Sequence, residues 1–230
     1  MAEDKQWPFF LAPLRGVLER LRPPAGTFDP NGAWEHRYAV CVLAPERGAR
    51  GEHPQPYGTL ALGRKPIAGG GFALEVDLSI STRGRSGMRS RASLMCADDR
   101  FGTPRQWELR SETIEQGRPV ADLTVVKRGS GDRNGTSNWS LLEAVQRLPF
   151  DAAPVSFDML EDLDLRKPGQ TLRPVDAVTL ELGGRAVRLH GFRQTGRGIL
   201  PTHYWLDERH RLIAVSGGLR GLVWAPRESA

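Results

Sequence analysis

The stretch THYWLDERHRLIAV, residues 202–215, gathers side chains that could do acid–base or metal chemistry. His203 and His210 flank Asp207 in the spacing H-x3-D-x2-H. On a helix, residues four apart lie on one face, so His203 and Asp207 would meet. Imidazoles and carboxylates serve both as general acids and bases and as metal ligands. The stretch therefore raises the hypothesis of a catalytic or metal site.

The local pattern argues against that hypothesis, because it is typical of a strand, a turn and a second strand. Pro201 precedes the stretch, and two largely apolar runs, 203–206 and 212–215, flank the polar residues 207–210. Successive side chains in a strand point to opposite faces of the sheet. His203 and Trp205 therefore share one face, Tyr204 takes the other, and His210 is predicted at an exposed turn away from His203.

His190 is a better companion for His203, because it lies on the preceding predicted strand. Side chains on adjacent antiparallel strands can meet across the ladder. The candidate catalytic residues are thus His190, His203 and Tyr204. Such a site needs a third convergent group, which the sequence does not reveal, so the alternative is a pair of structural histidines.

Other catalytic signatures are absent from the sequence. It holds no G-x-S-x-G motif, and neither Cys41 nor Cys96 stands in a pattern that activates a thiol. We therefore expect no metal and no cofactor, and we favour a protein that is not an enzyme. The two cysteines either form one disulfide or are two buried thiols that behave as small apolar side chains.

The chain is rich in arginine and carries a formal net charge of +5, with 32 basic residues of which only four are lysines. Four arginines crowd the predicted hairpin STRGRSGMRSR, and they could bind carboxylates or phosphates. A solvated hairpin tip is the alternative, which Gly84 and Gly87 favour. Aromatic residues do not alternate with the basic ones, which argues against nucleic acid as a partner. The candidate anion-binding residues are Arg83, Arg85, Arg89 and Arg91.

The elements that must position these residues are mostly strands. In FALEVDLSIS, five apolar side chains point one way and small or acidic ones the other, as in an antiparallel sheet with one wet face. Gly183-Gly184 joins two alternating runs and predicts a hairpin. The predicted strands cover 34–42, 57–64, 72–81, 88–96, 105–113, 119–128, 178–182, 185–192, 202–207, 211–216 and 219–225.

Two helices are predicted among these strands. Leu14, Leu18 and Leu21 recur at helical spacing over residues 10–22. Residues 138–148 form the second helix, with Ser140 and Glu143 at the spacing of a capping box. Residues 156–165 are read as a further short helix or a loop. Because helices rarely separate the strands, a parallel sheet of βαβ units is excluded.

The chain is read as one domain over 1–230, without a run of 18 apolar residues that could span a membrane. Its first residues, MAEDKQWPFFLAPL, lack the charge and apolar core of a signal peptide. The expectation is a cytoplasmic protein as the sequence is written, or a periplasmic one if a leader has been removed.

The C-terminal hairpin resembles a pattern in bacterial half-barrel proteins of the LolA-like group, the periplasmic lipoprotein carriers. A strand there ends in aromatic or aliphatic residues and an aspartate, and then turns into a strand of the form RL-I-V. The resemblance implies a strongly curved antiparallel sheet, open on one side, with helices capping its concave face. It also implies an apolar cavity that holds a lipid-like ligand or acyl chain without catalysis. The residues that carry it are Tyr204, Trp205, Leu206, Asp207, Arg211, Leu212, Ile213 and Val215.

Together these patterns predict a mainly β fold, a curved antiparallel half-barrel or barrel-like sheet with two or three helices packed on it. A β-sandwich is the alternative. The first function hypothesis is a non-enzymatic binding or carrier protein with an apolar small molecule or lipid on its concave face. The second is an enzyme that acts on a polar or acidic substrate, such as a polysaccharide, through a His/Tyr/Arg site. The residues predicted to line the ligand site are Phe72, Leu74, Val76, Leu78, Ile80 and Trp205.

Overall fold

The structure is a computed structural model of the 230-residue chain, and it describes residues 7–43, 56–82, 86–116, 118–120, 124–129 and 135–226. Two of the candidate anion-binding residues, Arg83 and Arg85, lie outside this part of the chain. None of the helices within it is long and apolar enough to cross a membrane.

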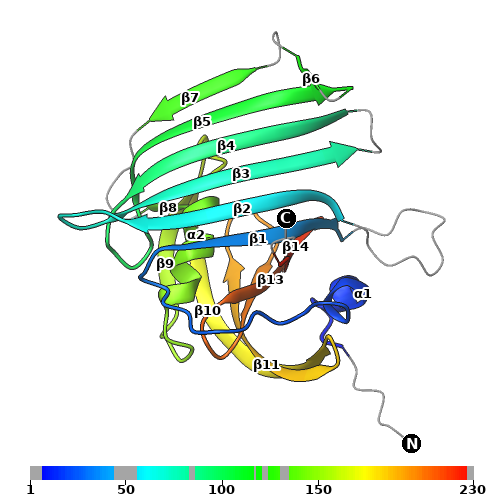
Figure 1. The fold of residues 1–230 in the computed structure, drawn as a ribbon. Coiled ribbons are helices and arrows are strands. Elements are labelled where there is room, and N and C mark those ends of the chain that lie inside the picture. Colours follow the sequence, from blue (N-terminus) through cyan, green and yellow to red (C-terminus); the bar gives the residue numbers. More distant parts are fainter. Residues whose placement is uncertain are drawn as a thin grey trace, which may run out of the picture.

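Fourteen strands in the described part of the chain form one sheet (Figure 1), in the order β6-β5-β4-β3-β2-β1-β14-β13-β12-β11-β10-β9-β8, with β7 paired to β5. All neighbours are antiparallel except β8 and β9. The strands are β1 (Trp34–Val42), β2 (Pro56–Pro66), β3 (Phe72–Thr82), β4 (Ser86–Cys96), β5 (Pro104–Glu115), β6 (Arg118–Pro119), β7 (Val125–Gly129), β8 (Gly135–Ser137), β9 (Val155–Glu161), β10 (Leu165–Leu182), β11 (Arg185–Thr195), β12 (Thr202–Leu206), β13 (Leu212–Gly217) and β14 (Arg220–Trp224).

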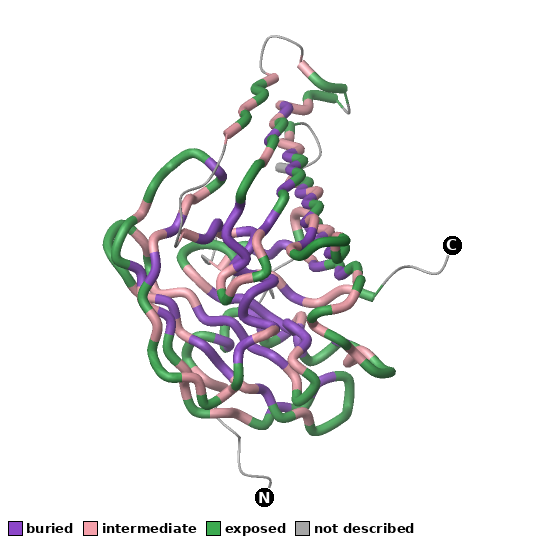
Figure 2. Tube along the Cα trace, turned by 90° about the vertical axis from the view of Figure 1, so that its left-hand side faces the viewer, coloured by how far each residue is buried: buried purple, intermediate pink, exposed green. Residues whose placement is uncertain are grey.

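The sheet curves strongly and does not close, because no ladder joins its two ends among the described residues. Side-chain contacts still bring parts of the two ends together. The Thr136 hydroxyl on β8 donates to the Phe101 carbonyl, beside β5, at 2.9 Å. The Lys127 ammonium on β7 pairs with Asp164 in the β9–β10 turn. Figure 2 shows the buried residues gathered in the middle and lower part of the molecule, and neither β6 nor β7 has a buried residue. The predicted barrel-like sheet is confirmed over the sandwich.

Helix α2 (Asn138–Ala144), continued by the 3-10 turn η3 (Val145–Arg147), packs into the concave side of the sheet (Figure 1). The predicted helix is confirmed, but its cap differs from the prediction. Ser137 is the N-cap and exchanges hydrogen bonds with Ser140, both at 2.9 Å. Ser140 therefore ends the capping box instead of starting it, and Glu143 has another role.

Glu143 closes one end of the concave side through a buried ionic cluster. Its Oε1 accepts from Arg64 Nε at 2.8 Å and from Arg147 Nε at 2.7 Å. The Glu143 side chain is fully buried, and those of Arg64 and Arg147 are 3% and 11% exposed. Both guanidinium groups lie over the Phe72 ring, at 4.3 and 5.6 Å from its centroid. The cluster therefore fixes α2 against β2 and β3.

The outer face of the sheet is covered by the N-terminal segment. Residues predicted as one helix over 10–22 form only a 3-10 turn η1 (Ala12–Leu14) and a single α-helical turn α1 (Arg15–Leu18). Pro13 and Gly16 explain the shortening, because Pro favours only the first positions of a helix and Gly weakens its interior. The predicted apolar face still forms, and Leu14, Leu18 and Leu21 are buried with Trp205 in a second apolar cluster.

Two other elements differ from the predictions. The segment at 156–165, read as a helix or loop, begins with strand β9, because Phe157 and Met159 alternate into the core and the long strand β10 offers a pairing edge. The predicted strand at 119–128 is divided into β6 and β7. The cysteines lie in different apolar clusters, Cys96 on the concave side and Cys41 under the N-terminal segment, and both are free thiols.

The polar residues of the hairpin that carries the LolA-like resemblance have a structural role, which is to hold its turn. Asp207 Oδ1 accepts from the backbone N–H groups of Arg209 and Arg211, both at 2.9 Å, and so fixes the turn. His210 adopts a φ of 64° within it. The buried Arg211 donates to the carbonyl oxygens of Pro24 at 2.9 Å and Thr27 at 2.8 Å. Asp207 and Arg211 therefore hold the turn and the incoming chain together and are not available for chemistry.

Candidate functional site

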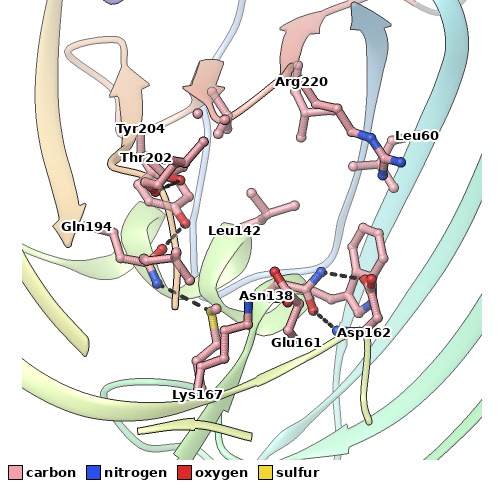
Figure 3. A pocket seen from close by; sticks show the side chains of 18 of the residues that line it. Leu60, Asn138, Leu142, Glu161, Asp162, Lys167, Gln194, Thr202, Tyr204 and Arg220 are labelled. Atoms are coloured by element: carbon pink, nitrogen blue, oxygen red, sulfur yellow. Dashed lines mark hydrogen bonds and ion pairs between the residues drawn. The ribbon is translucent and has the colours of Figure 1, made fainter. Parts of the chain in front are cut away.

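The candidate site is a cavity of about 360 Å³ between the concave face of the sheet and α2 (Figure 3). This volume is at the small end of the range for small-molecule sites, about 300–1,000 Å³. Its walls come from β1, β2, β3, β13 and β14, from β9 to β12 and from the inward side of α2. Six of its aliphatic lining residues are Val40, Leu60, Leu78, Leu142, Val215 and Leu222.

One hydrogen-bonded polar group lies on the wall of this cavity. The Tyr204 hydroxyl donates to Gln194 Oε1 at 2.6 Å. Gln194 Nε2 in turn lies 3.3 Å from Gln170 Oε1 and 3.3 Å from the Met159 sulfur. Burial raises the pKa of Tyr204, so its hydroxyl stays protonated. The Tyr204–Gln194 pair is therefore satisfied within the protein, whereas the buried indole N–H of Trp139, which also lines the cavity, has no hydrogen-bond partner among the described residues.

We expect Tyr204→Phe to lower the free energy of unfolding by about 1–2 kcal/mol, because Gln194 Oε1 would lose its donor inside the protein. Urea unfolding followed by intrinsic fluorescence measures this. Tyr57→Phe is the matched control, since the Tyr57 hydroxyl makes no hydrogen bond to the described residues, and it should change stability by less than about 0.5 kcal/mol. Equal losses in the two variants would show that the Tyr204–Gln194 bond contributes nothing specific.

Charged residues stand at the rim of the cavity. The Lys167 ammonium pairs with Glu161 and donates to the Gly198 carbonyl at 2.7 Å. Asp162 accepts from the Asn138 side-chain amide at 3.0 Å. Arg220 lies on the opposite side of the cavity from Lys167 (Figure 3) and makes no hydrogen bond or ion pair with the described residues. Among the residues that the structure describes, Arg220 is therefore a rim cation with no hydrogen-bond or ion-pair partner.

A larger groove of about 920 Å³ lies over β3, β4, β5 and β7, and we do not take it as the site. Each of its charged side chains already has a partner in the protein, within the groove or beside it. Arg128 Nε lies 2.6 Å from Glu108 Oε2, the Ser93 hydroxyl donates to Glu75 at 2.8 Å, and Arg91 and Arg110 pair with Asp77 and Glu112. A groove whose charges already have partners offers little to a charged ligand, whereas a mainly apolar cavity gains free energy when an apolar ligand fills it.

Arg89 and Arg91, the two candidate anion-binding residues that the structure describes, lie on the outer face of β4. Arg89 makes a two-pronged contact with Asp77, with Nε at 3.0 Å from Oδ1, and this pairing lowers the pKa of Asp77. Arg91 Nε lies 3.9 Å from the same carboxylate. Since Asp77 already occupies Arg89, these two residues do not form an anion site facing the cavity.

The strand predicted to line the ligand site is oriented as expected. Its apolar side chains all face the concave side, where Leu78 and Ile80 line the cavity and Phe72, Leu74 and Val76 form the core beneath it. Trp205, also predicted to line the ligand site, does not line the cavity. It lies in the outer apolar cluster under the N-terminal segment, because it alternates with Tyr204 along β12.

The structure does not bring His190 and His203 together. Across the β11–β12 ladder His190 is opposite Leu206, and His203 is opposite Arg193. Since alternate residues face opposite sides, the two histidines lie on different faces of the sheet. No group of three or more histidine, cysteine or acidic side chains in the described ranges could hold a metal. The predicted catalytic set of His190, His203 and Tyr204 is therefore dispersed.

His190, His203 and His210 each pack against an aromatic ring. The His203 ring stacks on Phe10 of the N-terminal segment, with centroids 3.7 Å apart. Phe150, shortly after the 3-10 turn η3, stacks on two histidines. Its ring centroid lies 3.8 Å from that of His190 and 4.0 Å from that of His210. Burial lowers the pKa of both His190 and His210. His210, predicted as an exposed tip, is only partly exposed for this reason.

Acid should destabilise the protein through His203, whose pKa burial lowers from 6.5 to about 4, with the Arg193 charge as a further cause. The folded state favours the neutral ring, so the stabilisation is complete above pH 6.5 and is lost as pH falls from there toward 4. Between pH 7 and 5 the loss should be about 2 kcal/mol. Urea unfolding of wild type and of His203→Asn at both pH values isolates the contribution of His203, because the two proteins have all other titrating groups in common. An unchanged pH dependence in the variant would contradict the assignment.

The comparisons with known proteins agree with the fold. A crystal structure from Brucella abortus, described as a beta-barrel-like protein of domain of unknown function DUF1849, superposes on this chain with a TM-score of 0.52. The match covers 85% of this chain and 96% of that one, at 9% sequence identity. The sequence matches no protein-family model and no curated protein. At this identity the likeness establishes a shared barrel-like fold.

Several residues of the cavity were not predicted from the sequence. Leu60 and Leu142 belong to patterns that indicate a buried face, but nothing local distinguishes a cavity wall from a packed core. Gln194, Lys167 and Arg220 come from three strands that only the tertiary fold brings around one opening. No local pattern in the sequence distinguishes these three residues from other polar residues of the strands.

Proposed function

We propose that the protein is a non-enzymatic binding or carrier protein that holds one apolar chain in the cavity between α2 and the concave face of the sheet. The observation that carries the proposal is the mainly apolar cavity, in which the buried polar pair of Tyr204 and Gln194 is already satisfied. An apolar ligand gains free energy there by leaving water and displaces no hydrogen bond of the protein.

The shape of the fold supports a binding role. Helix α2 is fixed from both sides, by the Glu143 cluster and by Gln146, whose Oε1 accepts from the Leu212 N–H at 3.2 Å. The cavity wall is therefore held in place before a ligand arrives, which lowers the ordering cost of binding. A carrier of the LolA-like kind, as the C-terminal hairpin suggests, would use its concave face in this way.

The volume limits the ligand to a single chain of moderate length. A cavity of about 360 Å³ has room for one slender molecule and not for the several acyl chains of a lipoprotein. The enzyme hypothesis receives no comparable support, because its histidines lie on opposite faces of the sheet.

A fluorescence titration tests the proposal. N-phenylnaphthylamine, which fluoresces in apolar surroundings, is titrated into protein that has been stripped of co-purified lipid, and is then displaced with decanoate and decanol. We expect saturable binding of one probe per chain with a Kd in the micromolar range, roughly −8 kcal/mol, and displacement by at least one of the two competitors. Binding that does not saturate, or that neither competitor displaces, would contradict the proposal.

A further inference from the structure

The rim of the cavity indicates which end group its ligand carries. Of the cations that line the opening, the Lys167 ammonium is already neutralised by Glu161 and held by the Gly198 carbonyl. Arg220, at the start of β14, is exposed and makes no hydrogen bond or ion pair with any described residue. Its guanidinium group is therefore available to a ligand that enters the cavity.

Apolar side chains line the cavity next to Arg220. It follows the β13–β14 turn, and two residues further along the same strand Leu222 lines the cavity. Residues i and i+2 of a strand point to the same face, so Arg220 and Leu222 lie on the same face of β14, with Arg220 at the rim and Leu222 further inside. Val215, opposite Leu222 on β13, extends that apolar line. A chain lying against Leu222 and Val215 would bring its end group next to Arg220.

The acidic residues at the rim are less available than Arg220. Glu161 is paired with Lys167, and the Asp162 carboxylate accepts a hydrogen bond from Asn138. A cationic end group would have to share one of these carboxylates with its present partner. An anionic end group meets a guanidinium group that donates to none of the described residues, and a charge-assisted contact of this kind is the stronger one.

We propose that the cavity takes a single-chain anionic amphiphile, with its carboxylate or phosphate end group on Arg220 and its apolar chain along Leu222 toward α2. The proposal rests on the binding function proposed above. A fatty acid and a single-chain phosphate ester share this chemistry, and they are separated by comparing their affinities. Arg220 is thus a specificity-determining residue, and the depth of the aliphatic wall limits the length of the chain.

The experiment uses three competitors of the N-phenylnaphthylamine probe that share one chain and differ in the end group: decanoate, decanol and decylammonium. Decyl phosphate distinguishes a phosphate from a carboxylate. Wild type should bind decanoate about tenfold more tightly than decanol, as expected for one charge-assisted contact, and decylammonium most weakly. Arg220→Gln should lose that tenfold preference while its affinity for decanol stays the same, and Arg220→Lys should recover part of it.

Arg185→Gln is the matched control, because it removes one exposed arginine of β11 at the Gly183–Gly184 turn, which does not line the cavity. It should bind all competitors like wild type. If decanoate and decanol bind equally in wild type, or if Arg220→Gln leaves the preference unchanged, the end-group inference is wrong while the binding function stands. If decylammonium binds most tightly, the rim selects cations through Asp162 or Glu161. If no competitor displaces the probe, the binding function itself is wrong.

Discussion

Replacing Glu143 by glutamine should destabilise the protein by about 3–5 kcal/mol. The substitution keeps the size of the side chain but removes its charge, and it leaves the buried Arg64 and Arg147 guanidinium groups without a counter-charge. Both cations also lie over Phe72, so they cannot turn to solvent without disturbing the core. Removing one member of a buried ionic cluster is far more costly than the cluster is stabilising. Urea unfolding at pH 7 measures the loss.

The control for this variant is Glu108→Gln. Glu108 pairs with Arg128 at 2.6 Å, but both side chains are well exposed, at 49% and 74%. An exposed pair contributes about 0–1 kcal/mol, so this variant should unfold nearly like wild type. Similar losses for the two variants would show that burial of the Glu143 cluster has no special energetic role.

Replacing Leu222 by tryptophan should abolish saturable binding of the apolar probe. Leu222 lines the cavity from β14 and is only partly buried, so a larger ring can occupy the cavity without displacing the packed core. We expect at least a tenfold loss of affinity, the equivalent of about 1.4 kcal/mol, and a change of stability within the 1–3 kcal/mol of a moderate overpacking. The probe titration and a urea curve on the same preparation give both values.

Val126→Trp is the control for the cavity-filling variant. Val126 lies on β7, is 48% exposed and does not line the cavity. The Val126→Trp substitution adds the same ring to the surface, so this variant corrects for non-specific attraction of the probe to tryptophan. A Leu222→Trp protein that binds the probe as wild type and Val126→Trp do would place the ligand outside the cavity.

Period-two alternation allowed most of the fold to be predicted from the sequence. The faces of β3 and β12 follow from it, since the side-chain period of a strand is two whatever the register. It also separates His203 from Tyr204 correctly. The segment at β9 was read wrongly, because seven residues with apolar side chains at Val155, Phe157, Met159 and Leu160 are compatible with a helical turn as well as with a strand. The pairing with β10, directly after the turn at Asp162 and Leu163, decides between them, and the sequence pattern predicts a strand only over 178–182 of β10.

The site could be predicted only in part, for the same reason. The inward face of β3 identifies one wall of the cavity, and the strand pattern implies that an opposite wall exists. Which residue meets His190 depends on the β11–β12 register, and the ladder places Leu206, three residues along the strand from His203, opposite His190. The arrangement of Arg220, Lys167 and Glu161 around one opening depends on the curvature of the sheet. That curvature brings together residues that are far apart in the sequence, which no local pattern encodes.

The most direct test of a ligand cavity between α2 and the sheet is a crystal structure of the protein with 10-bromodecanoate. The anomalous signal of bromine marks the end of the chain, and the carboxylate marks the other. We expect one bromine peak beside Leu60 and Leu142, with the carboxylate on Arg220. A bromine peak in the outer groove over β4 and β5, or no ordered ligand at concentrations that saturate the titration, would contradict the account.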